Sequence, residues 1–337
     1  MKILFLIEST QNETAKNLIS AFSAYPVDMV PYYEGGVDQC EIVEKNGASA
    51  LLFNEKLYYP SDYDAVLLWC WGTAAIGRKY LRLFEDNGVE VLNSTYHTQI
   101  TDSKIAFSRL LDNASIPSPK TIIFDKCFPA SKPESIDKVV SVLGSPPYVL
   151  KSDYGTQGKG IQFLPTLDET QKAIDALRSS PYPQNEFILQ EFIGDPEQEI
   201  FHYRVLVIGD QVLPKAIKAT ATQPMSVSNI STGGIVEWVT LDEEMKSIAL
   251  QTVKASGLLV AGVDLMVSPH QDQSSILVLE VNDGAGTKTF DKAGLQASQK
   301  IVDFFVSRIE SRDVTGINSK RKYTRPTDDT VSKEWSF

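Results

Sequence analysis

A glycine-rich segment that follows a lysine is the first candidate for chemistry. Lys151 ends the extended run Tyr148–Lys151, and the loop after it reads Gly155, Thr156, Gln157, Gly158, Lys159 and Gly160. Backbone N–H groups of such a loop can approach phosphate oxygens closely, because glycine carries no Cβ. A lysine beside the loop adds a positive point charge. No Gly-Lys-Ser/Thr triplet opens a helix, so a Walker A loop is not indicated, and an unliganded glycine-rich hairpin is the alternative interpretation.

Two carboxylates and an amide late in the chain are the second candidate. Glu280 and Asn282 are two residues apart in an extended run, so both side chains lie on one face of the predicted strand. If the strand that carries Asp264 is adjacent, three oxygen donors converge, and hard oxygen donors suit Mg²⁺. The alternative is a polar face of an exposed sheet. The flanking runs Leu258–Val263 and Ile276–Val281 are strongly apolar, which argues against a wholly exposed sheet.

Basic residues lie between these two groups, at Arg204, Lys215 and Lys218. Because Lys215 and Lys218 are three residues apart, a regular strand directs them to opposite faces, and at most one faces a common site. Each is also readable as an ordinary surface base. Nucleophile-based schemes have less support, since the chain lacks a G-x-S-x-G elbow. The three histidines are scattered along it, at His97, His202 and His270.

The first 95 residues alternate between strand and helix patterns, which predicts a small parallel sheet flanked by helices. The expected strands are Lys2–Ile7, Val27–Tyr33, Ala65–Trp69 and Val89–Leu92. The unusual run Trp69-Cys70-Trp71-Gly72 closes the third of them. Open α/β sheets bind ligands at the carboxyl ends of their strands, so this tryptophan pair can line a substrate pocket. Packing of the two rings in an aromatic core is the alternative.

Helices and antiparallel strands are expected in the rest of the chain. The periodic patterns predict helices near residues 98–112, 134–143, 167–178, 242–256 and 290–311. Between residues 187 and 240 strands dominate, and Gly209-Asp210 is a hairpin signal before one continuous strand over residues 211–220. Residues 313–337 are polar and aperiodic, which predicts a flexible tail.

Composition limits the classes of function. The 337-residue chain carries a net charge of −11, which argues against general binding of nucleic acid. No apolar run approaches the length of a membrane span, so a membrane partner is not expected. The three cysteines, Cys40, Cys70 and Cys127, form neither a disulfide framework nor a zinc motif. We therefore expect a cytoplasmic protein.

Taken in order, these motifs resemble the ATP-grasp superfamily, specifically its RimK-like branch of ribosomal-protein glutamate ligases and their relatives. The resemblance runs from about Asn93 to about Gly286. Each motif is short, but their joint occurrence in this order is specific. The motifs are Asn93-Ser94, Lys104, Ile116-Pro117-Ser118-Pro119, Tyr148–Lys151, the 155–160 loop, Leu189-Gln190-Glu191-Phe192-Ile193, Tyr203-Arg204-Val205, Ser228-Asn229, Gly233-Gly234, Ala261-Gly262-Val263-Asp264 and Glu280-Val281-Asn282.

The resemblance implies an α/β chain with α+β subdomains, that is, the ATP-grasp fold preceded by an N-terminal parallel βαβ domain. The expected domains are residues 1–95 for the N-terminal domain and 96–190 for the central and lid subdomain. Residues 191–312 would form the C-terminal subdomain with the Mg²⁺ site, and residues 313–337 the tail.

The resemblance also implies a nucleotide site. Lys104 and Lys151 match the two lysines that contact the phosphates, and the 155–160 loop matches the lid above them. The hinge that holds adenine corresponds to Gln190, Glu191, Phe192 and Ile193. Relatives carry an acidic residue for the ribose where this chain has His202, and Glu199 is the expected substitute.

Metal-binding and catalytic positions follow from the same comparison of motifs. Asp264, Glu280 and Asn282 match the ligands of Mg²⁺, with two ions expected and Mn²⁺ as an alternative metal. Arg204 matches the arginine that steadies the acyl-phosphate, Lys218 matches a basic residue near the phosphates, and Asn229 lies nearby.

The implied activity is ATP-dependent ligation of a carboxylate to an amine. The carboxylate attacks the γ-phosphate to give ADP and an acyl-phosphate, from which the amine displaces phosphate. At positions near the substrates the chain departs from the glutamate ligases. Val227 stands where they carry an arginine, and Ser231 and Thr232 stand where they carry basic residues. Their Ser-Ser-Pro-Gly becomes Asp283-Gly284-Ala285-Gly286. Glutamate addition to a ribosomal protein is therefore not carried over, and an amino acid, a peptide or a small metabolite is expected.

Two alternatives stay open. One is an ATP-grasp enzyme that modifies or cyclises a ribosomal peptide. The other is a synapsin-like protein that binds ATP without catalysis, which is disfavoured because the metal ligands and both phosphate lysines are all present. The sequence leaves the oligomeric state open, although RimK-like relatives are often homo-oligomers.

Overall fold

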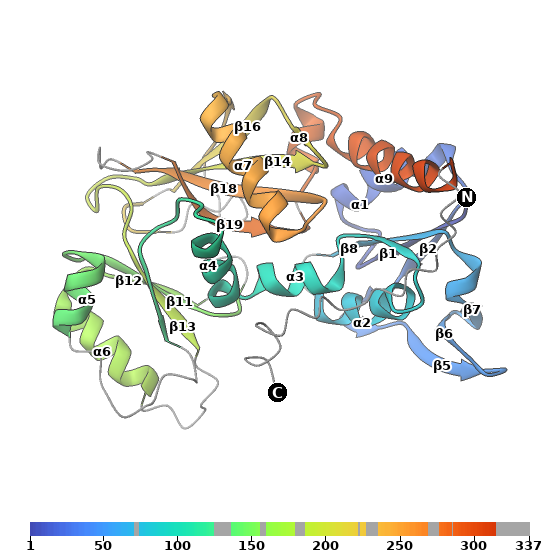
Figure 1. Ribbon diagram of the computed structural model, residues 1–337, viewed down its shortest axis with the longest axis horizontal. Coiled ribbons are helices and arrows are strands. Elements are labelled where there is room, and N and C mark those ends of the chain that lie inside the picture. The colour runs from blue at the N-terminus through green and yellow to red at the C-terminus, as the bar shows by residue number, and fades with distance from the viewer. Residues whose placement is uncertain are drawn as a thin grey trace. The chain divides into compact units, whose positions relative to one another are not determined.

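The computed structural model describes residues 1–70, 74–124, 136–155, 160–178, 186–221, 223–226, 235–268, 276–284 and 286–314. The chain forms two compact units (Figure 1). Unit 1 contains Met1–Thr95 and the segment that begins at Gly286, and unit 2 is Tyr96–Ala285. Within the described residues, no helix combines the length and the apolar character that crossing a membrane requires.

Unit 1 contains a four-stranded parallel sheet, as the sequence predicts. Its order is β2 (Val27–Pro31), β1 (Ile3–Ile7), β8 (Ala65–Trp69) and β9 (Glu90–Leu92). Every residue of β1 is fully buried, since helices cover both faces of the sheet. The helix α2 (Ala74–Glu85) packs against Leu4 and Leu6. On the other face Phe5 contacts Phe22, which follows α1 (Glu13–Ala21), with ring centroids 5.4 Å apart.

Two small antiparallel sheets in unit 1 have no counterpart among the sequence expectations. One pairs β3 (Tyr33–Glu34) with β4 (Val37–Asp38), and the other joins β5 (Glu41–Lys45), β6 (Ala48–Phe53) and β7 (Lys56–Tyr58). The first sheet turns at Gly35-Gly36 and the second at Asn46-Gly47 and Asn54-Glu55, all with positive φ. Four of these five strands are short or largely exposed and carry no long apolar run; β6 is the exception, since Ala50 and Leu51 are fully buried. Two 3₁₀ turns, Phe22–Ala24 and Pro60–Asp62, complete this part.

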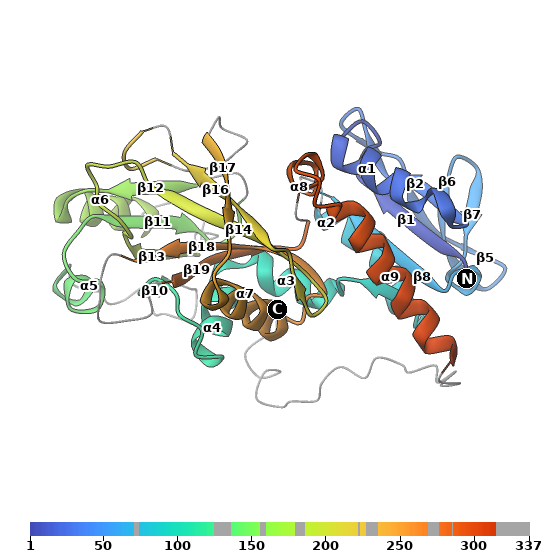
Figure 2. The same ribbon diagram turned by 90° about the horizontal axis from the view of Figure 1, so that it is seen from above.

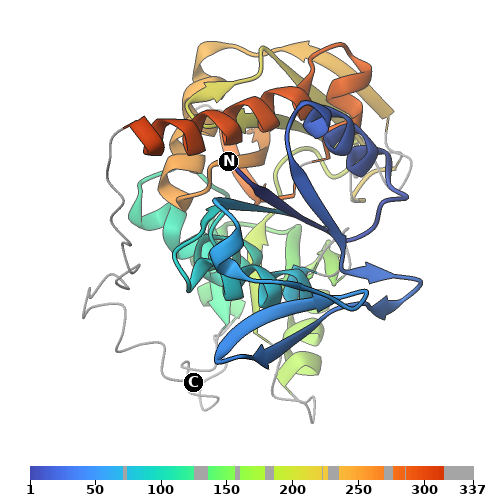
Figure 3. The ribbon, with the colours of Figure 1, turned by 90° about the vertical axis from the view of Figure 1, so that its right-hand side faces the viewer.

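The C-terminal helices belong to unit 1 and differ from the expected single helix over residues 290–311. The structure has α8 (Lys288–Lys292) and α9 (Ala297–Val314), separated by Gly294 and Gln296 with positive φ. Asn17 of α1 donates a hydrogen bond to Asp291 at 2.9 Å, and α9 lies beside α1 (Figure 3). Residues 286–312, which the sequence assigns to the C-terminal subdomain, therefore belong to unit 1, where α8 and α9 pack against α1. The expected tail overlaps the end of α9, and its remainder lies outside the described residues.

Unit 2 begins with two helices where one was expected. Residues 98–112 divide into α3 (Thr95–Asp102) and α4 (Lys104–Asn113). Ser103 separates them because its backbone is extended and its side chain caps α4 by accepting a hydrogen bond from Ala106 N. The break makes Lys104 the first residue of a helix, and not an interior one.

The first sheet of unit 2 is antiparallel. Its order is β10 (Thr121–Phe124), β13 (Phe187–Glu191), β11 (Tyr148–Ser152) and β12 (Ile161–Leu164). The helices α5 (Ile136–Leu143) and α6 (Leu167–Arg178) pack against this sheet. Val139, Leu143 and Ile174 bury their side chains with Tyr148 and Leu150 of β11, which fixes the strand that carries Lys151.

The second sheet of unit 2 has the order β17 (Ile235–Thr240), β16 (Lys215–Thr220), β14 (Phe201–Ile208), β18 (Val260–Val267) and β19 (Ile276–Asn282). The hairpin at Gly209-Asp210 is present, but its second strand is broken into β15 (Gln211–Val212) and β16. Helix α7 (Glu243–Ser256) is capped by Asp242 and ends at Gly257, with φ +72°. It lies with α4 on one side of the sheet (Figure 2), so functional side chains are left to the other side.

Candidate active site

An arginine–aspartate pair forms the centre of the second sheet of unit 2. Antiparallel pairing of β14 and β18 sets Arg204 opposite Asp264. Arg204 donates from Nε to Oδ1 at 2.7 Å and from Nη2 to Oδ2 at 2.6 Å. Asp264 is 3% exposed. Burial alone would raise its pKa, but the surrounding groups, with the charge of Arg204 first among them, hold the pKa below its usual range. The bidentate pair therefore fixes both side chains in one orientation.

The next strand brings the other two predicted metal ligands to the same place. On β19, Glu280 pairs with Asp264 and Asn282 pairs with Gly262. The amide of Asn282 lies 3.4 Å from Asp264 Oδ2 and 3.3 Å from Glu280 Oε1. A register shift follows Asp264, so β19 has one extra residue there, and β-bulges of this kind often direct side chains next to active sites.

The donor set fits a magnesium ion better than a transition metal. Among the described residues, no group of three or more His, Cys, Asp and Glu side chains is arranged to hold a metal. Asp264, Glu280 and Asn282 offer two carboxylates and one amide, all capable of oxygen ligation. Mg²⁺ typically takes one or two carboxylates and completes its shell with water and phosphate oxygens. Turning the Asn282 amide about its last torsion would present Oδ1 in place of Nδ2.

Lys151, one of the two predicted phosphate lysines, lies within electrostatic reach of Glu280 and of the other lysine, Lys104. Burial of the Lys151 ammonium lowers its pKa to about 8, an effect that the negative charge of Glu280 opposes and the positive charge of Lys104 increases. Lys104 Nζ donates to the backbone oxygens of Asp153 at 3.4 Å and Gly155 at 3.0 Å. A helix start, a strand of the first sheet and a strand of the second sheet thus bring opposite charges together, where a phosphate chain and its metal would be neutralised.

We expect nucleotide affinity to fall as pH rises through about 8, because free Lys151 loses its proton there. Phosphate favours the charged lysine, so binding at higher pH requires uptake of a proton. Between about pH 7 and pH 9.5 the Kd for ADP should rise about tenfold. The titration is done in EDTA, so that no metal ion alters the field at Glu280. Lys151→Arg keeps its charge over this range and should show a flat profile; an equal slope in that variant would contradict the assignment.

The polar side chains of the predicted hinge form hydrogen bonds with neighbouring residues of the protein. Gln190 Nε2 donates to Thr121 Oγ1 at 2.9 Å, and a Glu191 carboxylate oxygen accepts from Lys120 N at 2.8 Å. The chain then turns into Ile193, which is buried in a small apolar cluster. That cluster contains Ile193, Met266 and Leu277, with Ile200 and Leu279 packed against it. A purine ring packs against an apolar surface of this kind, so the residues after Glu191 suit adenine better than the Glu191 side chain does.

Two of the predicted site residues, Lys218 and Glu199, do not lie with Arg204, Asp264 and Glu280. Lys218 pairs with Tyr203, so it lies on the sheet face opposite Arg204. Its ammonium is 3.1 Å from a Glu237 oxygen and 4.5 Å from the centre of the Phe201 ring. Glu199 is exposed in the segment before β14. Thr156, Gln157, Gly158, Asn229 and Trp71 lie outside the described residues.

Gly160 closes the glycine-rich loop in a conformation that other residues rarely adopt. Its φ is +77°, and an added Cβ would lie 2.6 Å from Ser152 Oγ. We expect Gly160→Ala to lower the free energy of unfolding by about 1–2 kcal/mol in urea denaturation. Gly144→Ala is the control, because its φ is +81° but nothing lies within 4 Å. Equal losses in the two variants would show that the contact with Ser152 has no effect.

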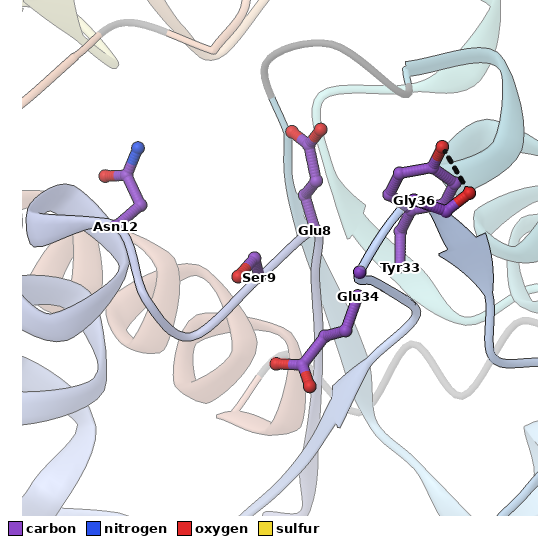
Figure 4. Close-up of a pocket in the computed structure, with 7 residues that line it drawn as sticks. Glu8, Ser9, Asn12, Tyr33, Glu34 and Gly36 are labelled. Carbon is purple, nitrogen blue, oxygen red and sulfur yellow. Dashed lines mark hydrogen bonds between the residues drawn. The ribbon is translucent and has the colours of Figure 1, made fainter.

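Unit 1 has a separate hollow of about 340 Å³ at the carboxyl ends of β1 and β2 (Figure 4). Parallel sheets commonly bind ligands at this edge. Glu8 and Glu34 make the lining acidic, and Tyr33 is held by a 3.0 Å hydrogen bond to the oxygen of Gly36. Every lining side chain is at least partly exposed, and we therefore assign no ligand to the hollow.

Sequence patterns missed several residues of the site in unit 2. His202 is 5% exposed, and its Nε2 lies 3.8 Å from Asp264 Oδ1. Met266 and Leu279 supply apolar surface, and Asp153 contacts the start of α4. The alternation of β14 could have shown that His202 shares a face with Arg204. No local signal relates Asp153 to a helix fifty residues earlier in the chain.

Comparison with known proteins gives one family. The model of the RimK-like ATP-grasp domain matches residues 101–305. A probable alpha-L-glutamate ligase 1 of Shewanella frigidimarina is 32% identical over 236 residues, which are 70% of this chain and 73% of that protein. A probable alpha-L-glutamate ligase of Legionella pneumophila is 31% identical over 263 residues, covering 74% of this chain and 80% of the relative.

Solved structures agree in fold at low identity. The D-alanine–D-alanine ligase of Bacillus anthracis aligns with a TM-score of 0.63 and 18% identity, over 94% of this chain and 100% of that one. The ATP-grasp ligase PsnB, complexed with a minimal precursor, Mg and ADP, aligns with a TM-score of 0.63 and 17% identity, over 91% and 97% of the two chains. These similarities confirm the predicted fold and do not distinguish between substrates.

Proposed function

Because the chain belongs to the RimK-like ATP-grasp family, we propose that it is an ADP-forming ligase that joins a carboxylate to an amine with ATP and Mg²⁺. The observation that carries the proposal is the convergence of Lys104, Lys151 and Glu280 beside the Arg204–Asp264 pair. The relatives named as alpha-L-glutamate ligases support the reaction class. This arrangement offers positive charge to phosphate and oxygen donors to a metal ion.

The reaction we propose has two displacements. An oxygen of the substrate carboxylate forms a bond to the γ-phosphorus of ATP as the bond to ADP breaks, which gives an acyl-phosphate. A neutral amine then attacks the acyl carbon, phosphate leaves, and the amine loses a proton to form the amide. Most of the rate enhancement in such transfers comes from positioning and charge neutralisation, and less from covalent participation of the protein.

Each residue of the site has a proposed task. Lys104 and Lys151 hold the phosphate chain, while Asp264, Glu280 and Asn282 hold Mg²⁺, which would neutralise phosphate charge when bound. Arg204 is directed by Asp264 and steadies negative charge on the acyl-phosphate. The apolar cluster around Ile193 and Met266 would receive adenine, with backbone groups of the hinge as polar partners. Lys218 has no task in this scheme, because its register directs it to the other face.

The substrate pair is proposed to differ from that of the glutamate ligases. Val227 stands where those enzymes carry an arginine, and Ser231 and Thr232 stand where they carry basic residues. The residues that follow Asn282 also differ from their motif. We propose an amino acid, a peptide or a small metabolite as the acceptor or donor.

Phosphate release from ATP and Mg²⁺ tests the proposal across a panel of amino acids, dipeptides and small acids. We expect release to depend on one carboxylate–amine pair and an amide to appear in equal amount by mass spectrometry. ATP binding without turnover for every pair would favour an enzyme that acts on a ribosomal peptide or a non-catalytic ATP-binding protein. A chain that binds no ATP would refute the proposal.

A further inference from the structure

Asp153 is a buried carboxylate that the proposed chemistry does not use. It stands two residues after Lys151 and is 4% exposed. Its carboxylate accepts from Ser103 Oγ at 2.9 and 3.1 Å and from Ile105 N at 2.8 Å. A buried carboxylate is retained only where hydrogen bonds replace its water. The partners here come from the first turn of α4, fifty residues earlier in the chain.

The backbone of Asp153 strengthens this connection. Its oxygen accepts from Lys104 N at 3.2 Å and from Lys104 Nζ at 3.4 Å, and its N–H donates to Glu186 O at 2.9 Å. Residue 153 is therefore bonded at once to α4 and to the segment that leads into β13. The main chain that leaves β11 has no freedom to move away from the helix without breaking these bonds.

Ser103 joins the carboxylate of Asp153 to the N-terminus of α4. Its hydroxyl accepts from Ala106 N at 3.0 Å, as an N-cap does, and donates its own proton to Asp153. The negative charge of Asp153 thus lies at the N-terminus of α4, where the helix dipole favours an anion. A serine cap alone would already begin the helix, so stability of α4 does not by itself require the aspartate.

We propose that Asp153 is a positioning residue of the nucleotide site, whose carboxylate holds the first turn of α4 against the end of β11 and so keeps Lys104 and Lys151 in one frame. The inference rests on the proposed function, since it needs both lysines to contact the phosphates. Asp153 acts on nucleotide affinity by holding Lys104 in place. The residue itself does not touch the nucleotide.

A double-mutant cycle separates positioning from simple stabilisation. The Kd for ADP with Mg²⁺ is measured by calorimetry in the wild type, Asp153→Ala, Lys104→Ala and the double variant. We expect Asp153→Ala to raise Kd about tenfold in the presence of Lys104 and less than about twofold in its absence. Asp153→Asn keeps an acceptor oxygen for Ile105 N and should restore most of the affinity, with Kd within about threefold of the wild type.

Asp242 provides the matched control. It caps α7 in the same unit by accepting from Met245 N at 2.7 Å, away from the lysines. Asp242→Ala should lower the melting temperature to a similar degree as Asp153→Ala and leave Kd unchanged. If Asp153→Ala does not fold, Ser103→Ala takes its place in the cycle.

The outcomes are distinct. Equal changes in Kd with and without Lys104, or a Kd unchanged by Asp153→Ala, would overturn the inference while the proposed function stands. A wild type that binds no nucleotide would refute the proposed function and the inference with it.

Discussion

We expect Glu280→Ala to lower kcat for ATP-dependent phosphate release by about a thousandfold or more, because several kcal/mol of charge stabilisation is lost with one metal ligand. Glu280 lies opposite Asp264 at the register shift of β18 and β19, next to the amide of Asn282. Its charge also counteracts the low pKa of Lys151. Removing it therefore takes away a proposed metal ligand and part of the field that keeps Lys151 charged.

The fold should survive this change, since 48% of the Glu280 side chain is exposed. Thermal unfolding and circular dichroism would check this. The surface carboxylate Glu243, 90% exposed on α7, is the control, and Glu243→Ala should keep full activity. Undiminished turnover in a folded Glu280→Ala would remove this residue from the metal site and leave the proposed chemistry without its second carboxylate.

Arg204→Met should lower both stability and activity. The substitution leaves the Asp264 carboxylate buried without its bidentate partner, and such a loss typically costs about 3–5 kcal/mol. Urea denaturation at pH 7 would measure it. If Arg204 steadies the acyl-phosphate as proposed, turnover of the folded fraction should also fall by about a hundredfold.

The stability difference should shrink at low pH. In the wild type the pKa of Asp264 is lowered in the folded state, so its contribution is present above the unfolded pKa of about 4 and is lost as pH falls through the folded pKa. In Arg204→Met, burial raises the pKa of Asp264, because no arginine opposes it. The carboxyl group therefore takes up a proton at a higher pH, and the variant no longer carries a buried charge. A gap that stays constant down to about pH 3 would contradict this account.

Lys246→Met is the matched control for Arg204→Met. Lys246 forms a surface ion pair with Glu243 on α7, and pairs of this kind contribute less than about 1 kcal/mol. We expect little change in stability and none in turnover. The stability and turnover of Arg204→Lys should lie between those of Arg204→Met and Lys246→Met, because lysine keeps the charge but cannot form the bidentate bond.

The comparisons fix the reaction class more firmly than the substrates. A D-alanine–D-alanine ligase and the ATP-grasp ligase PsnB have the same TM-score of 0.63 to this chain, so similarity of fold does not identify the substrates. The substrates must be read from side chains that face them. His202 does not serve for this, because it stands at the position matched to the ribose and is buried beside Asp264.

The sequence by itself determined the parallel order of the N-terminal strands, since unbroken apolar runs of buried strands are local. It also predicted that strands dominate residues 187–240 and that Glu280 and Asn282 share a face, the latter because side chains on a strand alternate with a period of two. Motif order identified the family, because the chemistry of phosphate and Mg²⁺ requires particular residue types at fixed spacings.

Only the tertiary structure decided which of these residues meet. Lys218 lies away from Arg204 because the pairing of β14 with β16 sets it opposite Tyr203. The extra residue in β19 and the bonds from Asp153 to α4 are likewise invisible to local patterns. The C-terminal helices joined unit 1 through contacts with α1 nearly three hundred residues earlier in the chain. Register and packing between distant segments depend on the free energy of the whole fold, and no short stretch of sequence encodes them.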